Sequence, residues 1–231
     1  MRLGIHGVQG RMGLKVLAGA LSDETFSQIS GYARKKTSET NGYASVNSLP
    51  ELTDNSDVII DFSSPLALNS LLQIAVEKKI PLVMGTTGLS KEIIQHMEAA
   101  AKQIPILYAA NFSLGVAACT LAAEILFQKL SSDFQTHIIE THHVHKKDSP
   151  SGTALAFSEV MENTPPIKSI REGEVIGKHQ IFFLNEQEVI QLSHEALSRD
   201  TFAKGALFAA KALVLNPPGL YSLKDILGMQ K

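Results

Sequence analysis

Three histidines and two lysines lie within six residues, in the segment His142-His143-Val144-His145-Lys146-Lys147. After three intervening residues, Ser151-Gly152-Thr153 precedes an apolar run, which is typical of a helix start. A histidine exchanges a proton near neutral pH, and a lysine donates one where its pKa is lowered. A cationic loop beside helix N–H groups also binds small dianions such as dicarboxylates. The segment therefore indicates proton transfer on an anionic small molecule.

Two other interpretations of this segment stay open. The first is a zinc site built from His142, His143 and His145. Adjacent side chains on a strand point to opposite faces, so only His143 and His145 could share an ion, and we expect no metal. The second is a solvated basic loop without a chemical role, because runs of charge are common on protein surfaces.

A glycine-rich loop, Gly7-Val8-Gln9-Gly10-Arg11-Met12-Gly13, stands between the first expected strand and the first expected helix. Glycines suit such a turn because it needs unusual backbone angles and brings the main chain close to a pyrophosphate. The N–H groups of the helix and the Arg11 cation would then meet the phosphate charge. The loop predicts a dinucleotide site, and a purely structural turn is the alternative.

A basic run, Arg34-Lys35-Lys36, stands where the second strand of a dinucleotide-binding unit usually ends in an acidic residue. An acidic residue there binds the ribose hydroxyl of NAD, whereas cations favour the extra phosphate of NADP. A solvated surface run is the alternative.

The elements that position these segments alternate between strand and helix in the first half of the chain. This alternation predicts a parallel sheet covered by helices, with ligands at the carboxyl ends of the strands. The expected strands are 3–6, 28–33, 58–62, 81–84 and 104–109, and the expected helices are 11–21 and two that start near Pro65 and Ser90.

The pattern changes after residue 111. We expect a long helix over Leu114–Leu130, a strand over 136–141, a helix from Gly152 and a hairpin of strands 179–184 and 188–193. A last helix, 201–215, is apolar enough that we expect it to pack against the first unit. The predicted domains are 1–111 with 200–231 for the dinucleotide and 112–199 for substrate binding and oligomerisation.

Composition excludes several classes of protein. The chain has 231 residues, 44% of them hydrophobic, and a net charge of −2, which gives no general attraction to nucleic acid or to an anionic membrane. Its single cysteine, Cys119, excludes an internal disulfide and indicates a reducing compartment. The N-terminus is too polar for a signal peptide and no run is long enough to span a membrane, so we expect a cytoplasmic protein.

Taken together and in this order, these motifs resemble the dihydrodipicolinate reductase (4-hydroxy-tetrahydrodipicolinate reductase) family. The resemblance extends over nearly the whole chain, and the stretch from Glu140 to Ala154 is its most specific part. It implies an α/β protein with an N-terminal Rossmann domain and an α+β substrate and oligomerisation domain, whose sheet is mixed or antiparallel. The other matching segments are 7–13, 61–65, 85–88 and 110–116.

The resemblance also implies the reaction. Family members reduce 4-hydroxy-tetrahydrodipicolinate, a cyclic dicarboxylate, to tetrahydrodipicolinate with NADH or NADPH, in the diaminopimelate route of lysine biosynthesis, and they assemble as homotetramers. His142 would be the general acid or base, Lys146 a proton donor and His143 a substrate contact, with the N–H groups of Gly152 and Thr153 on a carboxylate. The nicotinamide end would lie against Gly85, Thr86, Thr87, Ala109, Ala110, Asn111 and Phe112.

Two departures from the family pattern and three other classes of protein complete the hypotheses. Arg34 and Lys35 stand where NADH-using members carry a carboxylate, which favours NADPH, and the stretch 169–179 is shorter than in many members. A zinc hydrolase has no use for the glycine loop, and a non-catalytic nucleotide-sensing module has no use for Lys146. A semialdehyde dehydrogenase needs a reactive cysteine, whereas Cys119 lies in an apolar run typical of a buried thiol.

Overall fold

The computed structural model of the protein describes residues 1–34, 42–130, 132–161 and 164–228. The chain divides into two compact units, one made of Met1–Phe112 and Phe202–Gln230 and the other of Ser113–Thr201. None of the described helices is both long enough and apolar enough to cross a membrane.

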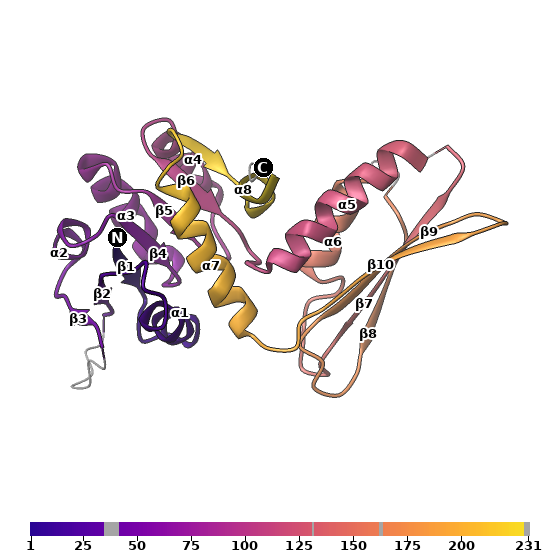
Figure 1. Cartoon of the computed structure of the whole chain (residues 1–231), viewed down its shortest axis with the longest axis horizontal. Helices are drawn as coiled ribbons and strands as arrows, with labels where there is room; N and C mark the ends of the chain where they lie inside the picture. Colours follow the sequence, from indigo (N-terminus) through magenta and orange to yellow (C-terminus); the bar gives the residue numbers. More distant parts are fainter. Residues whose placement is uncertain (35–41, 131, 162–163, 229–231) are drawn as a thin grey trace. The chain divides into compact units, whose positions relative to one another are not determined.

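The first unit is built on a parallel sheet of seven strands (Figure 1). Continuous apolar strands such as Val58-Ile59-Ile60 are buried on both faces, as is usual for parallel sheets. The strand order reverses at the first strand, and ligands bind such sheets at the carboxyl ends beside this reversal. In spatial order the strands are β11 (Gly219–Tyr221), β6 (Pro105–Tyr108), β5 (Leu82–Met84), β4 (Val58–Asp61), β1 (Arg2–His6), β2 (Gln28–Tyr32) and β3 (Ala44–Ser45).

Helices cover this sheet on both faces. The core on one face joins three helices, α2 (Leu49–Asp54), α3 (Pro65–Lys78) and α4 (Lys91–Ala101), to inward side chains of the strands. Two others, α1 (Arg11–Leu21) and α7 (Asp200–Leu213), lie side by side, and Lys211 of α7 forms an ion pair of 2.8 Å with Asp23, two residues after the end of α1. A short helix, α8 (Leu223–Gly228), ends the described chain.

The second unit is a mixed sheet with two helices on one face (Figure 1). Its spatial order is β10 (Val189–Glu195), β9 (Lys178–Leu184), β7 (Gln135–His142) and β8 (Ile167–Arg171), and only the β7–β8 pair is parallel. The helices are α5 (Leu114–Leu130) and α6 (Gly152–Glu159). Their apolar faces pack on inward side chains such as Ile138, Ile181 and Phe183.

The predicted fold class is confirmed, since a parallel-sheet α/β unit and a separate mixed four-stranded sheet are both present. Most predicted elements recur within two residues of their expected ends. Five short elements were not expected: β3, α2, β8, β11 and α8. They have two to six residues each. The three strands lack both a continuous apolar run and a strict alternation of apolar and polar residues, and the two helices are too short for helical periodicity to show.

Candidate active site

The turn between β1 and α1 has a backbone that requires glycine. Gly7 has a φ of +84°, and a Cβ there would lie 2.5 Å from the carbonyl oxygen of Phe62. A Cβ on Gly13 would lie 2.1 Å from the carbonyl oxygen of Gly7, so α1 packs directly on the turn. The Gly10 N–H donates to the same carbonyl at 2.9 Å. The turn therefore exposes main chain rather than side chains to its surroundings.

The N-terminus of α1 is suited to an anion. Its N-cap, Gly10, offers no side-chain acceptor, and the first turn contains no acidic residue. The first N–H groups of an α-helix have no partner within the helix, and the helix dipole favours negative charge there. Arg11 adds an exposed cation at the same end. These residues fit the diphosphate of a dinucleotide.

A buried carboxylate that the sequence pattern did not single out joins the loops at this edge of the sheet. Asp61 ends β4 without solvent exposure and accepts hydrogen bonds from Ser63 Oγ at 2.6 Å and Thr86 Oγ1 at 2.5 Å. His6, the last residue of β1, places its Nδ1 2.7 Å from Asp61 Oδ1. Its ring stacks on Tyr32 at the end of β2. Asp61 thus holds the strand ends beside the glycine loop.

The two segments expected at the nicotinamide end, 85–87 and 109–112, follow the neighbouring strands β5 and β6. A Cβ on Gly85 would lie 2.1 Å from the Phe62 ring, and the Phe112 ring packs edge-on against Phe62 with 5.5 Å between centroids. Both segments therefore lie at the carboxyl edge of the sheet, where the glycine loop also lies.

Of the basic run after β2, the described residues include only Arg34. Its side chain is exposed two residues beyond the end of β2. Lys35 and Lys36 lie outside the described residues.

In the second unit, His142 ends β7 and is held by a buried carboxylate. Side chains alternate along a strand, so Glu140 and His142 lie on the same inward face. Glu140 is completely buried, and its Oε2 makes a short contact with His142 Nδ1. Its Oε1 lies 2.9 Å from Nη2 of Arg171, at the end of β8. The strand register places Arg171 directly beside His142.

The electrostatics of this group fix the protonation of His142. Burial would raise the pKa of Glu140, but hydrogen bonds from Arg171, Ser169 and His142 outweigh it and the pKa is lowered. Glu140 is therefore an ionised acceptor, which requires a proton on His142 Nδ1. Burial also lowers the pKa of His142, despite the opposing effect of Glu140. At neutral pH the ring is uncharged, and its Nε2 carries a lone pair.

His179 connects His142 to the start of α6. The two rings pack edge-on with 5.1 Å between centroids, and His179 Nε2 lies 3.1 Å from Ser151 Oγ. Ser151 is the N-cap of α6, and its Oγ accepts a hydrogen bond from the Ala154 N–H at 3.2 Å. Burial lowers the pKa of His179 to about 4, so this ring is neutral as well. A Cβ on Gly152 would meet open space, so a ligand has room at the helix N-terminus.

The basic side chains in the loop between β7 and α6 differ in burial and in pairing. Lys146 is partly buried, and its Nζ lies 2.8 Å from Asp148 Oδ1. The Lys146 N–H donates to the carbonyl oxygen of His143 at 3.1 Å, which closes a turn. His145 and Lys147 are exposed. The structure therefore distinguishes Lys146 from its neighbour Lys147 by burial and pairing.

The described residues contain no group of three or more His, Cys, Asp or Glu side chains arranged to hold a metal ion. His142 Nδ1 contacts Glu140, whereas the ring centroids of His143 and His145 lie 6.3 Å apart. The strand ends at His142, so the alternation of side chains invoked for the two later histidines does not apply to them.

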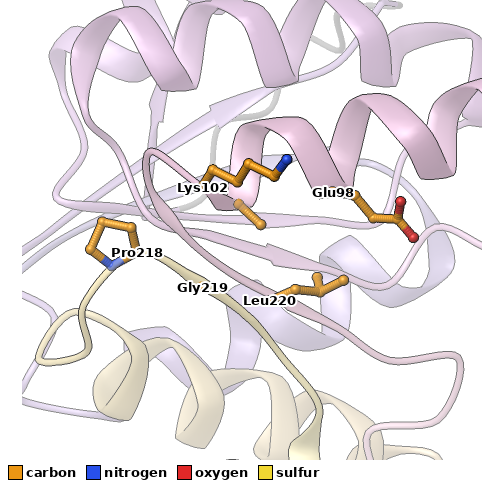
Figure 2. A pocket seen from close by; sticks show the side chains of 6 residues that line it. Glu98, Lys102, Pro218, Gly219 and Leu220 are labelled. Carbon is orange, nitrogen blue, oxygen red and sulfur yellow. The ribbon is translucent and has the colours of Figure 1, made fainter.

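A pocket elsewhere on the first unit does not belong to this site. Figure 2 shows it between α4 and β11, with Glu98, Lys102, Pro218 and Leu220 around it. Gly219 in its floor pairs with Pro105, the first residue of β6. The pocket is therefore at the amino end of this strand, away from the carboxyl edge.

Comparison with known proteins places the chain in one family. The family model "Dihydrodipicolinate reductase, N-terminus" matches residues 1–112, and "Dihydrodipicolinate reductase, C-terminus" matches residues 115–227. The chain belongs to the dihydrodipicolinate reductase family. A protein of this family from Nitratiruptor sp., named 4-hydroxy-tetrahydrodipicolinate reductase, is 37% identical over 99% of this chain and all of its own length. One of the same name from Xanthomonas campestris pv. campestris is 39% identical over 96% of this chain and 95% of its own.

The fold is also that of a solved structure, the dipicolinate-bound dihydrodipicolinate reductase from Paenisporosarcina sp. TG-14. The TM-score is 0.85, at 21% identity, and the match covers 99% of both chains. The resemblance drawn from the sequence is therefore confirmed at the level of family and fold. Membership in this family of dinucleotide-dependent reductases implies use of NAD(P)H, which the cradle at Gly7–Gly13 fits.

Proposed function

We propose that this chain reduces 4-hydroxy-tetrahydrodipicolinate to tetrahydrodipicolinate with NADPH or NADH, in the diaminopimelate route of lysine biosynthesis. The observation that carries the proposal is the arrangement in the second unit. Glu140 holds a neutral His142, and the ring of His179 lies between His142 and Ser151, the N-cap of α6. This arrangement occurs in a chain that matches the family models at both ends.

The first unit would bind the dinucleotide. Gly7, Val8, Gln9, Gly10, Arg11 and Met12 would hold the diphosphate through the turn and the N-terminus of α1. Bound there, the cofactor supplies a hydride to the substrate. Gly85, Thr86, Thr87 and the segment 109–112 would border the nicotinamide end. Arg34, with Lys35, would contact the ribose phosphate of NADPH, which makes NADPH the preferred cofactor.

The second unit would bind the substrate as a dianion. The N–H groups of Gly152 and Thr153 begin α6, where a carboxylate is stabilised by the helix dipole. The open space above Gly152 supports this placement, since a carboxylate there meets main chain directly. His143 is half-buried in the loop that leads to the helix and would contact the second carboxylate.

His142 and Lys146 would share the proton chemistry that follows hydride transfer. Because burial lowers the pKa of His142, its ring is neutral at neutral pH and can accept a proton at Nε2, and the protonated ring would then release that proton readily. Lys146 carries protons on Nζ and is held by Asp148 at 2.8 Å. We therefore assign proton donation to Lys146 and proton relay to His142.

A homotetramer in the cytoplasm completes the proposal. One face of the second unit's sheet is covered by α5 and α6. Side chains such as Ile139, Phe182 and Gln191 lie on the opposite face, which none of the described helices of this unit covers. A face of this kind suits pairing with other copies of the chain.

Alanine variants of the loop test the division of labour. His142→Ala and Lys146→Ala should each lower kcat by roughly 10²–10⁴-fold, the range for loss of a general acid or base. The KM for the dinucleotide should stay nearly unchanged, because its phosphates bind in the other unit. His145→Ala and Lys147→Ala are matched controls, since they remove an exposed imidazole and an exposed ammonium from the same loop. An equal loss of kcat in all four variants would show that the loop acts only through its overall charge.

A further inference from the structure

Arg171 lies between the two groups to which we assign the proton chemistry. It is the last residue of β8, and 21% of its side chain is exposed. Its Nη1 donates to the carbonyl oxygen of Ile170 at 2.7 Å, which fixes the guanidinium against its own strand. Its Nη2 makes two further contacts, one with Glu140 and one with Asp148. Each of these leads to a different member of the proposed proton pair.

The first contact leads to His142. Nη2 of Arg171 lies 2.9 Å from Glu140 Oε1, and the other oxygen of Glu140 contacts His142 Nδ1. A completely buried carboxylate is costly to keep ionised without a cation beside it. The guanidinium therefore keeps Glu140 an acceptor, and Glu140 in turn holds the His142 ring with its proton on Nδ1 and its lone pair on Nε2.

The second contact leads to Lys146. The same Nη2 donates to the backbone carbonyl oxygen of Asp148 at 2.6 Å, and the carboxylate of Asp148 lies 2.8 Å from Lys146 Nζ. Arg171 thus anchors the loop at the residue that pairs with the lysine. The guanidinium of Arg171 is therefore linked to His142 through a single residue, Glu140, and to Lys146 through a single residue, Asp148.

We propose that Arg171 is a positioning residue that holds His142 and Lys146 in fixed relation to each other, through Glu140 on one side and Asp148 on the other. This inference rests on the proposed function, because holding His142 and Lys146 in fixed relation matters for catalysis only if both take part in the proton chemistry. It extends that function to a residue outside the loop, on a different strand.

The test is to replace Arg171 and follow both catalysis and the titration of His142. Arg171→Gln removes the charge and keeps a polar side chain, whereas Arg171→Lys keeps the charge and loses the planar fork. Loss of alignment should lower kcat by about 10²-fold in Arg171→Gln. The KM for the dinucleotide should remain at the wild-type value. Arg171→Lys should recover part of the lost kcat.

The titration of His142 gives a readout that does not need substrate. Arg171 acts on the pKa of His142 directly through its charge and indirectly by keeping Glu140 ionised, so the pKa of His142 should shift in Arg171→Gln and stay close to the wild-type value in Arg171→Lys. NMR of the ring protons in the full chain measures it, with His142→Asn to assign the signal. The ionisable groups that face this ring are Glu140 on its own strand, Arg171 on β8, His179 on β9, and Lys146 and Asp148 in the loop.

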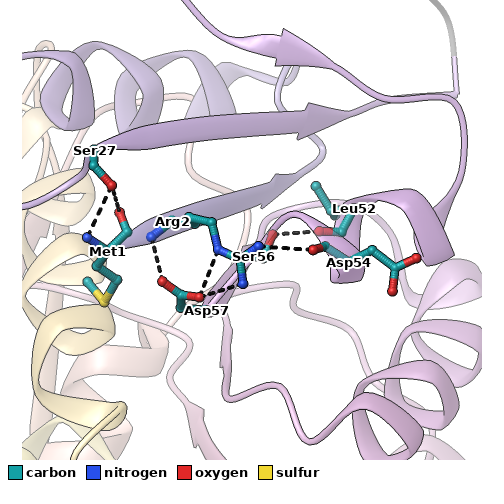
Figure 3. Close-up of polar contacts among 7 residues, drawn as sticks. All are labelled: Met1, Arg2, Ser27, Leu52, Asp54, Ser56 and Asp57. Atoms are coloured by element: carbon teal, nitrogen blue, oxygen red, sulfur yellow. Dashed lines mark hydrogen bonds and ion pairs between the residues drawn. The ribbon is translucent and has the colours of Figure 1, made fainter.

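Arg2→Gln is the matched control. Arg2 also joins a carboxylate and a carbonyl, with Nη2 at 2.7 Å from Asp57 and Nη1 at 3.1 Å from the carbonyl oxygen of Asp54, but it does so on the surface of the first unit (Figure 3). This variant should leave kcat and the pKa of His142 unchanged.

Three outcomes decide between the hypotheses. Unchanged kcat and unchanged His142 titration in Arg171→Gln would overturn the positioning role. A loss of kcat in Arg171→Gln that comes only with a lower melting temperature, and with no change in the His142 titration, would also overturn it, since a structural role explains that result. If the wild-type chain fails to turn over the substrate while the His142 titration still responds to Arg171, the proposed function is wrong and the link between the two residues stands.

Discussion

The neutral imidazole of His179 makes the stability of the second unit depend on pH. The ring is 4% exposed, packs against His142 and Phe157, and has a pKa lowered by burial to about 4. In the unfolded chain its pKa returns to the ordinary value of 6.5. Between these two values the unfolded state binds more protons than the folded state, so stability rises with pH across this window.

The size of the effect follows from the two pKa values. Lowering the pH from about 7 to about 4.5 should cost about 2 kcal/mol of unfolding free energy through His179 alone. His179→Gln removes the titrating group and keeps a polar side chain near Ser151. Over this pH interval the wild type should therefore lose about 2 kcal/mol more unfolding free energy than the variant does. Comparison of each protein with itself at two pH values separates this difference from any packing loss.

Urea denaturation followed by circular dichroism measures it. Phe183→Leu is the control, because Phe183 lies on the same strand and the same inward face, is completely buried and does not titrate. This variant should be less stable than the wild type by the same amount at both pH values. If His179→Gln loses as much stability on acidification as the wild type does, the ring is not buried in neutral form, and the description of His179 as a neutral link is wrong.

Three further predictions concern the ligands. Gly152→Ala should keep the melting temperature, because a Cβ there meets open space. The added methyl group would occupy the space in which the carboxylate meets the N–H groups, so the KM for the dicarboxylate should rise about tenfold or more as a charge-assisted hydrogen bond is lost; an unchanged KM would remove the carboxylate from this position. Neutral replacements of Arg34 and Lys35 should raise the KM for NADPH far more than that for NADH, and equal effects on both would contradict the NADPH preference. Activity should survive exhaustive chelation, and a loss that zinc restores would return the histidines to the role of metal ligands.

Local signals in the sequence predicted the elements that carry the candidate site residues. The glycine loop and α1 were expected over the range where they occur, because a strand, a glycine turn and an apolar helix follow one another directly. The loop from His142 to Thr153 was equally visible, since its cations and its helix start are contiguous. The N-cap role of Ser151 agrees with the helix expected from Gly152.

The partners of these residues depend on contacts between distant segments. Arg171 meets Glu140 only because β8 lies beside β7 in parallel register, and the β8 sequence, Ile167-Lys168-Ser169-Ile170-Arg171, has neither a continuous apolar run nor a strict alternation that would predict a strand. His6 meets Asp61 only because β1 and β4 are neighbours. Glu140 is the exception: two residues before His142 in an expected strand, it shares the histidine's face, and this spacing was a usable signal.

The central claim is that this chain reduces the cyclic dicarboxylate of its family. The most direct measurement is the oxidation of NADPH and of NADH, followed by absorbance, with 4-hydroxy-tetrahydrodipicolinate generated enzymatically in the same reaction. We expect oxidation that depends on both the chain and the substrate, is faster with NADPH at limiting cofactor, and is abolished or strongly reduced in Lys146→Ala. Oxidation of neither cofactor by a folded wild-type chain would contradict the account.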